Sequence, residues 1–147
     1  MTFAGGLASR GMLPVFCVYS SFLQRGYDQV LHDLAIDQRH AVLCVDRAGL
    51  VGEDGETHQG VFDAAFLSQV PHITVYSPEG YDELRLCLHK ALFDEAGLVA
   101  VRYPRGCDKK CHHLAISDDF SYKDRGGDTL LVSYGCLLYT SPSPRDR

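Results

Sequence analysis

The segment from Asp46 to Gly60 carries the side chains best suited to chemistry. It reads DRAGLVGEDGETHQG and follows the apolar run 41–45. Within it Arg47 is a permanent cation, Asp54 is an anion, and His58 titrates near neutrality. Four glycines lie in its last twelve residues, which excludes a regular helix or strand. This combination predicts a site for an anionic ligand. The alternative is a solvated surface loop with turn glycines.

The elements that must position this segment follow from the hydrophobic pattern. Four short apolar runs rich in β-branched residues predict strands, and they cover residues 14–19, 41–45, 73–76 and 98–102. Helical patterns lie between these runs, so strands alternate with helices. We therefore expect an α/β fold with three layers, in which helices cover both faces of a mainly parallel sheet.

Helix starts are predicted from capping signals. Ser21, followed by Gln24 three residues later, is a capping box. Ser77 before Pro78 has serine at the N-cap and proline at the first helical position. Residues 1–11 are typical of the last turns of a close-packed helix whose beginning is missing.

Three side chains are expected on one rim of this sheet. In an open parallel sheet, ligands bind beyond the carboxyl ends of the strands. Tyr19, Arg47 and Arg105 each follow or end a predicted strand. Arg102, within the last strand, is expected to form a structural ion pair. Arg25 has the spacing to pair with Asp28 on a helix. The alternative is that Arg25 serves the site, because it lies close to Phe22 in the sequence.

Composition limits the function classes. The 147 residues are 46% hydrophobic and 22% charged, which is ordinary for one globular domain. A net charge of −5 gives no reason to expect nucleic acid as a partner. No apolar run reaches the roughly 20 residues that span a membrane, and no secretory signal is present. Six scattered cysteines indicate reduced, packed thiols in an intracellular protein.

The chain is expected to divide into four parts. Residues 1–106 form the α/β domain, 107–127 are a polar linker, and 128–135 begin a truncated C-terminal domain. Residues 136–147 resemble the translation of a transposase-type sequencing adapter. We expect this tail to be an artefact; the alternative is a natural Ser/Pro-rich tail.

A metal site is the weaker interpretation of one cluster in the linker. Cys107, Cys111, His112 and His113 supply four possible zinc ligands, but they are crowded into one segment without a second pair elsewhere. A solvated linker is favoured, and no metal ligand is assigned.

Three phrases together resemble one family. They are YSSFLQRGYDQ at 19–29, DRAGLVGEDGETHQGVFD at 46–63 and RYPRG at 102–106. The chain resembles the pyrimidine-binding domain of 1-deoxy-D-xylulose 5-phosphate synthases, which are thiamine-diphosphate enzymes of the transketolase superfamily. The resemblance covers roughly residues 1–135, and the second phrase is its most specific part.

The resemblance implies roles for six residues. Phe22 would stack on the aminopyrimidine ring of thiamine diphosphate. Tyr19, Arg47 and Arg105 would hold the phosphate of D-glyceraldehyde 3-phosphate, for which guanidinium groups are well suited. Asp54 and His58 would be catalytic groups that assist orientation and proton transfer.

The resemblance also implies a reaction. Pyruvate and D-glyceraldehyde 3-phosphate would condense to 1-deoxy-D-xylulose 5-phosphate and CO2, a precursor of isoprenoids, thiamine and pyridoxal. The family's Glu-Gln-His-Ala phrase would stand just before Met1, and its Gly-Asp-Gly and Asn magnesium motif is absent. We therefore expect a fragment without activity of its own, from an enzyme that is homodimeric at full length.

Two points stay open at this stage. Bacterial cytoplasm is the default location, with a plastid copy as the alternative. A non-catalytic module of the same fold that binds an anionic metabolite is the alternative function.

Overall fold

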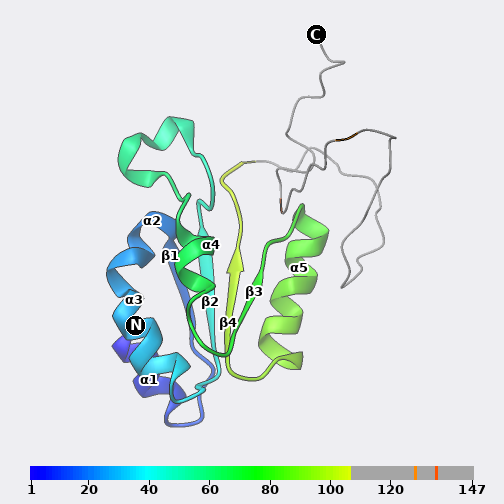
Figure 1. The fold of residues 1–147 in the computed structure, drawn as a ribbon. Coiled ribbons are helices and arrows are strands. Elements are labelled where there is room, and N and C mark those ends of the chain that lie inside the picture. Colours follow the sequence, from blue (N-terminus) through cyan, green and yellow to red (C-terminus); the bar gives the residue numbers. More distant parts are fainter. Residues whose placement is uncertain (107–127, 129–134, 136–147) are drawn as a thin grey trace.

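The computed structural model describes residues 1–106, 128 and 135, and in them four parallel strands form one sheet (Figure 1). The order is β1-β2-β4-β3. The strands are β1 Val15–Tyr19, β2 Ala41–Asp46, β3 Ile73–Tyr76 and β4 Leu98–Arg102. Their register places Tyr19 beside Asp46 and Val45 beside Arg102. The carboxyl ends of these strands therefore lie at one edge.

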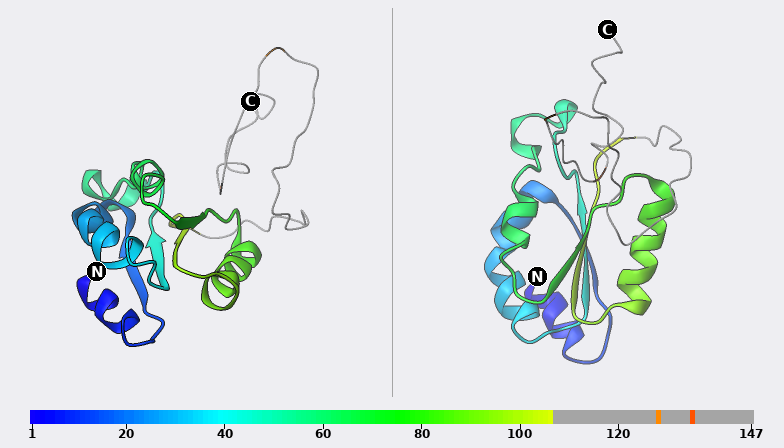
Figure 2. Two further views of the ribbon diagram at one scale, coloured as in Figure 1. Left: turned by 60° about the horizontal axis from the view of Figure 1, so that its bottom comes forward. Right: turned by 45° about the vertical axis from the view of Figure 1, so that its right-hand side comes forward.

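Helices cover both faces of this sheet (Figures 1 and 2). One layer holds α1 Thr2–Ala8, α2 Ser20–Leu23, α3 Tyr27–Val30 and α4 Asp63–Leu67, and the other holds α5 Tyr81–His89. A 3-10 turn, η1 Gln24–Gly26, joins α2 to α3, and the π-helical segments η2 Leu31–Ala35 and η5 Lys90–Asp94 extend α3 and α5. The predicted three-layer α/β class is confirmed.

Two apolar clusters, one on each face of the sheet, form the core. The first packs strand residues such as Leu43 and Val45 against Val30 and Leu34 of the α3 helix and its extension. The second packs Val42, Cys44, Val99 and Val101 against Cys87 and Ala91 of the α5 helix and its extension. The central strand β2 is buried from residue 41 to 45, as its unbroken apolar run predicts.

The predicted capping box is wrong. Helix α2 begins at Ser20 with extended Tyr19 as its N-cap, so the strand passes into the helix without a linker. Ser21 therefore lies inside the first turn, and its hydroxyl does not cap the helix. The hydroxyls of Ser20 and Ser21 are buried and make no hydrogen bond within the described part of the chain.

The predicted cap at Ser77 is also wrong. Helix α5 begins at Tyr81 with Gly80 as its N-cap. The Ser77 hydroxyl instead accepts a hydrogen bond from Arg102 Nη1 at 3.0 Å. Ahead of the helix, the amide of Glu79 donates to Glu83 Oε2 at 2.6 Å. Asp82 and Glu83 make the first turn of this helix acidic, which suits the positive end of the helix dipole.

Arg102 forms the structural ion pair that was predicted. Its guanidinium donates to both carboxylate oxygens of Asp63, with Nε–Oδ2 at 2.8 Å and Nη2–Oδ1 at 3.1 Å. Asp63 is fully buried and the Arg102 side chain is 10% exposed. The pair therefore ties the start of α4 to the end of β4.

Some predictions fall on parts of the chain that the structure does not describe. These are the linker at 107–127, nearly all of the segment 128–135, the tail at 136–147 and the cluster Cys107–His113. In the described residues, no helix has the length and apolar character needed to cross a membrane.

Candidate functional site

The rim at the carboxyl ends of β1, β2 and β4 collects the predicted site residues. Tyr19 ends β1, Arg47 follows β2, and Arg105 lies three residues beyond β4. The segments that follow β2 and β4 stay hydrogen-bonded to each other, because the amide of Ala48 donates to Tyr103 O at 3.0 Å. Parallel strand ends thus bring together side chains that lie far apart in the sequence.

The loop after β2 is an ordered structure with two fixed ends. Gly49 and Gly60 pair as an antiparallel bridge, with N–O distances of 2.7 and 2.8 Å. A Cβ atom on Gly60 would lie 2.2 Å from Arg47 O and 2.6 Å from Ser20 Oγ. Only glycine fits at this position, so the backbone can close here only without a side chain.

Gln59 holds the middle of the loop. Its Nε2 donates to Val51 O at 3.0 Å and Gly55 O at 2.9 Å, while its Oε1 accepts from Val51 N at 2.9 Å. Two short 3-10 turns, η3 Gly52–Asp54 and η4 Glu56–His58, lie within the segment that Gln59 closes. They set the positions of Asp54 and His58.

Arg47 is held from three sides. Its backbone has a left-handed φ of 58°, and its Nη1 donates to Asp46 Oδ2 at 2.6 Å. Its Nε donates to Asp54 Oδ2 at 2.8 Å. The guanidinium carbon lies 3.9 Å from the centre of the Tyr19 ring, a cation–π contact.

The electrostatics of Arg47 favour its charged form. Desolvation of its guanidinium, the largest single effect, lowers the pKa. The hydrogen bond to Asp54 and the charges of Asp46, Tyr19 and Asp54 together raise the pKa by more, so the net pKa is raised. Arg47 therefore stays a cation at the rim.

Asp54 joins the two arginines. Its Oδ1 lies 3.1 Å from Arg105 Nη1, while its Oδ2 accepts from Arg47. Arg105 Nη1 also lies 3.0 Å from Oε2 of the exposed Glu53. The two guanidinium groups predicted to hold phosphate thus share one carboxylate, and 19% of its side chain is exposed.

His58 completes a cluster of three rings. Its ring centre lies 5.1 Å from that of Phe22 and 5.7 Å from that of Tyr19, and the Tyr19 and Phe22 rings are 5.5 Å apart. Its Nδ1 lies 3.0 Å from Thr57 Oγ1. All six residues predicted for the site are therefore joined through direct contacts.

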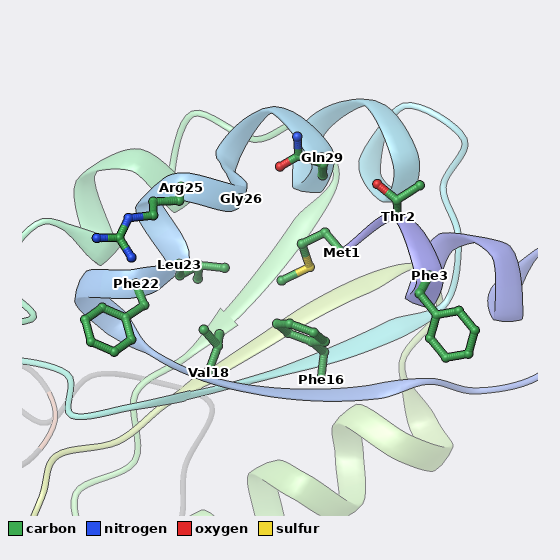
Figure 3. Close-up of a pocket in the computed structure, with 10 residues that line it drawn as sticks. All are labelled: Met1, Thr2, Phe3, Phe16, Val18, Phe22, Leu23, Arg25, Gly26 and Gln29. Carbon is green, nitrogen blue, oxygen red and sulfur yellow. The ribbon is translucent and has the colours of Figure 1, made fainter.

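A cavity of about 400 Å³ begins beside this cluster (Figure 3). Phe22 lies at one end and Phe3 at the other, with Met1 between the helical segment and β1. The apolar wall includes Phe16 and Val18. The lining suits a flat heteroaromatic ring with polar groups at its edge. Polar atoms come from Thr2, Arg25 and Gln29.

Arg25 and Asp28 do not pair with each other as predicted. The Arg25 guanidinium carbon lies over the Phe22 ring, 5.6 Å from its centre. Asp28 instead pairs with His32 one helical turn later, at 3.0 Å. The cation thus belongs to the edge of the cavity.

Sequence reasoning gave no role to Asp46, Glu53 or Gln59, which hold the site together. Asp46 could have been found as an acid placed directly between a buried strand and an arginine. For Gln59 no comparable signal exists, because its three bonds depend on the path of the loop. In the described residues, no three His, Cys, Asp or Glu side chains are grouped so that they could hold a metal ion.

Comparison with known proteins identifies the class to which this chain belongs. Residues 1–107 match the family described as "Transketolase, pyrimidine binding domain". This match covers well over half of the chain, and the chain belongs to this family.

Several curated relatives carry the same enzyme name. Proteins named 1-deoxy-D-xylulose-5-phosphate synthase from Chlorobaculum tepidum and Clostridium perfringens are 57% and 56% identical over 106 and 108 residues, which is 72% and 74% of this chain. The protein of that name from Shouchella clausii is 43% identical over 143 residues and covers 93% of this chain. The chain spans 17 to 23% of the length of these relatives.

A solved structure supports the fold. One solved chain is described as "Split gene transketolase, inactive beta4 tetramer". The alignment covers 82% of the present chain and 37% of the solved chain, with a TM-score of 0.63 and 21% sequence identity. This similarity establishes the transketolase-type fold of the domain.

Proposed function

We propose that this chain supplies the pyrimidine-binding domain of a thiamine-diphosphate-dependent transferase that condenses pyruvate with D-glyceraldehyde 3-phosphate. The products are 1-deoxy-D-xylulose 5-phosphate and CO2. The names of the relatives support the reaction. The structural observation on which the proposal rests is that two guanidinium groups, those of Arg47 and Arg105, lie near Tyr19 on one rim.

The arginines bind the phosphate of the aldehyde substrate in this proposal. Each already holds one oxygen of Asp54, so their spacing suits two oxygens of a single anion. Arg105 is 39% exposed at its side chain and can turn toward solvent, whereas Arg47 is only 20% exposed. Arg47 would therefore fix the position of the phosphate, and Arg105 would adjust to it.

His58 and Asp54 assist proton transfer and orientation at the reacting carbons. His58 lies against Phe22, so a ring stacked on Phe22 would bring the histidine next to the reaction centre. Thiamine diphosphate, when bound, supplies the decarboxylation and carbon–carbon bond chemistry. Phe22 and the cavity beside Met1 would hold its pyrimidine end, while Mg2+ would be bound by another domain of the enzyme.

The remaining assignments follow from the same proposal. The working enzyme is a homodimer in the bacterial cytoplasm that makes precursors of isoprenoids, thiamine and pyridoxal, and this chain alone is inactive. Residues 1–106 are its pyrimidine-binding domain, 107–127 a linker and 128–135 the start of a further domain. The tail at 136–147 does not belong to the enzyme.

A domain exchange tests the function. Residues 1–106 replace the matching segment of the Chlorobaculum tepidum enzyme, and activity is measured with each substrate varied in turn. We expect an active chimera in which Arg47→Ala or Arg105→Ala raises KM for D-glyceraldehyde 3-phosphate by about 10- to 100-fold, because each removes a charge-assisted contact. The KM for pyruvate should change far less.

Arg85→Ala is the matched control, since Arg85 is an exposed arginine on α5 away from the rim. Arg85→Ala should leave the KM for D-glyceraldehyde 3-phosphate and the KM for pyruvate unchanged. Equal losses for the two substrates in the rim variants would contradict the phosphate assignment.

The second candidate is a non-catalytic module that binds an anionic metabolite. The observation that favours it is that Arg47, Arg105 and Tyr19 all come from this one chain. An inactive chimera, together with phosphate binding by the separate chain that Arg47→Ala abolishes, would support this module instead of the enzyme.

A further inference from the structure

Two cysteines lie side by side on strands β1 and β2. Cys17 and Cys44 are register partners in this parallel pair. Neighbouring strands lie about 4.8 Å apart, and disulfides join Cα atoms that are about 4.4 to 6.8 Å apart. The backbone spacing is therefore compatible with a cross-link without a change of register.

Both thiols point to the same face of the sheet. Phe16 and Val18, which flank Cys17, pack against the first core cluster, so Cys17 faces the opposite side. Cys44 belongs to the second cluster, on that opposite side. The Cys17 thiol is close enough to contribute to the raised pKa of Cys44.

The two thiols differ in access to solvent. Cys17 is exposed, because β1 is the edge strand and α5 covers the other end of this face (Figure 2). Cys44 is buried, with 6% of its surface exposed. This corrects the expectation of packed thiols for Cys17. An accessible thiol next to a buried one is the arrangement of a reactive and a resolving cysteine.

We propose that Cys17 and Cys44 form a peroxide-sensitive dithiol that closes reversibly to a disulfide, a modification separate from the proposed catalytic function. Hydrogen peroxide oxidises the Cys17 thiol to a sulfenic acid and is reduced to one water. The Cys44 sulfur then attacks the Cys17 sulfur, and a second water leaves. Two thiols lose two electrons and two protons in total, and a dithiol reductant reverses the reaction.

The order of these steps follows from the environment. Burial, and then the neighbouring Cys17, raises the pKa of Cys44 to about 12, so its thiolate is scarce at neutral pH. Peroxide therefore reacts first at Cys17, and ring closure is the slower step, which speeds up as pH rises.

The cross-link would lie close to the rim. The Tyr19–Asp46 register pair lies two residues beyond the Cys17–Cys44 pair on the same two strands. A disulfide would therefore join the two strands two residues before Tyr19 and Asp46, which both contact the Arg47 side chain.

Peptide mapping tests the proposal on the whole chain. Trypsin releases Cys17 in peptide 11–25 and Cys44 in peptide 40–47, each with a single cysteine. After peroxide and blocking of free thiols, we expect these two peptides to be joined, and a dithiol reductant to separate them. Unjoined peptides with Cys17 converted to sulfinic acid, an unmodified Cys17, or a cross-link from Cys17 to another cysteine would each overturn the proposal.

Two variants sharpen the test. In Cys44→Ala the sulfenic acid should persist, so a dimedone adduct should accumulate on peptide 11–25 well above the wild-type level. Cys87→Ala removes another buried cysteine of the second cluster and should leave the cross-link unchanged. Equal dimedone labelling in Cys44→Ala and wild type would contradict the role of Cys44, and the wild-type map decides the matter if Cys44→Ala does not fold.

Discussion

The central carbon of the Arg47 guanidinium lies over the Tyr19 ring, 3.9 Å from the ring centre. These residues end or follow adjacent parallel strands, so the contact is set by the sheet. Arg47 is therefore positioned before any ligand binds, and its backbone lies in the left-handed region with a φ of 58°.

This stacking predicts that Arg47→Lys fails to replace the arginine. Lysine keeps the charge, but it loses the planar fork that bonds Asp46 and Asp54 and stacks on Tyr19. In the chimera described above, KM for D-glyceraldehyde 3-phosphate should rise about 10-fold. Arg85→Lys, on the exposed surface of α5, should have no effect; a wild-type KM in Arg47→Lys would show that charge alone is enough.

Gly60→Ala should disrupt the loop. The added Cβ meets Arg47 O at 2.2 Å and Ser20 Oγ at 2.6 Å, so the Gly49–Gly60 bridge must open. We expect a loss of about 1 to 3 kcal/mol in the free energy of unfolding, measured by urea denaturation.

Gly52→Ala is the control within the same loop. A Cβ at this position meets nothing within 4 Å, so stability should change little. If both variants were equally stable, the close approach at Gly60 would have no energetic role.

The buried ion pair predicts a large effect when its positive charge is removed. Arg102→Met leaves the Asp63 carboxylate buried without its guanidinium partner, which should cost about 3 to 5 kcal/mol of unfolding free energy. Arg39→Ala breaks an exposed pair with Asp37 and should cost less than about 1 kcal/mol. Comparable losses in the two variants, by the same urea titration, would contradict the structural role of Arg102.

Stability should fall at high pH. Burial, followed by the neighbouring Cys17, raises the pKa of Cys44 from 9.0 to about 12, and burial with the charge of Cys44 raises that of Tyr103 from 10.0 to about 12. Between these values the folded state keeps protons that the unfolded state has lost. The stabilisation is thus complete below about pH 9 and is lost as pH rises toward 12.

Denaturation at about pH 8 and about pH 11 measures this effect. Wild type should lose stability between the two conditions, and Cys44→Ala and Tyr103→Phe should each lose less. If both variants lost as much unfolding free energy as wild type between the two pH values, other groups would account for the loss at alkaline pH.

The strands could be predicted because their signal is local. The apolar runs at 73–76 and 98–102 coincide with β3 and β4, and the run at 41–45 differs from β2 by one residue. Each run is bounded by polar or glycine-rich turns. The runs that form β2 and β4 are buried almost throughout, whereas β3 is only partly buried. The local apolar pattern, rather than full burial, therefore locates the strands.

Helix starts could not be predicted, because distant side chains compete for the capping groups. Serine is a residue type that favours an N-cap, yet the hydroxyl of Ser77 accepts a hydrogen bond from Arg102, 25 residues away.

The geometry of the site could be predicted only in part for the same reason. Its residue types were identified from one loop and the strand ends, but the position of Asp54 between Arg47 and Arg105 depends on how the loop folds back.

The three hydrogen bonds of Gln59 give the rim loop a consequence for sequence variation. The side-chain amide joins both ends of the segment from Val51 to Gln59, so the segment forms a closed ring of fixed circumference. Residues at the tip of that ring, such as Glu56 and Thr57, can change in type without altering its path. An insertion or deletion cannot be absorbed, so homologous sequences should vary here in identity but keep the same length.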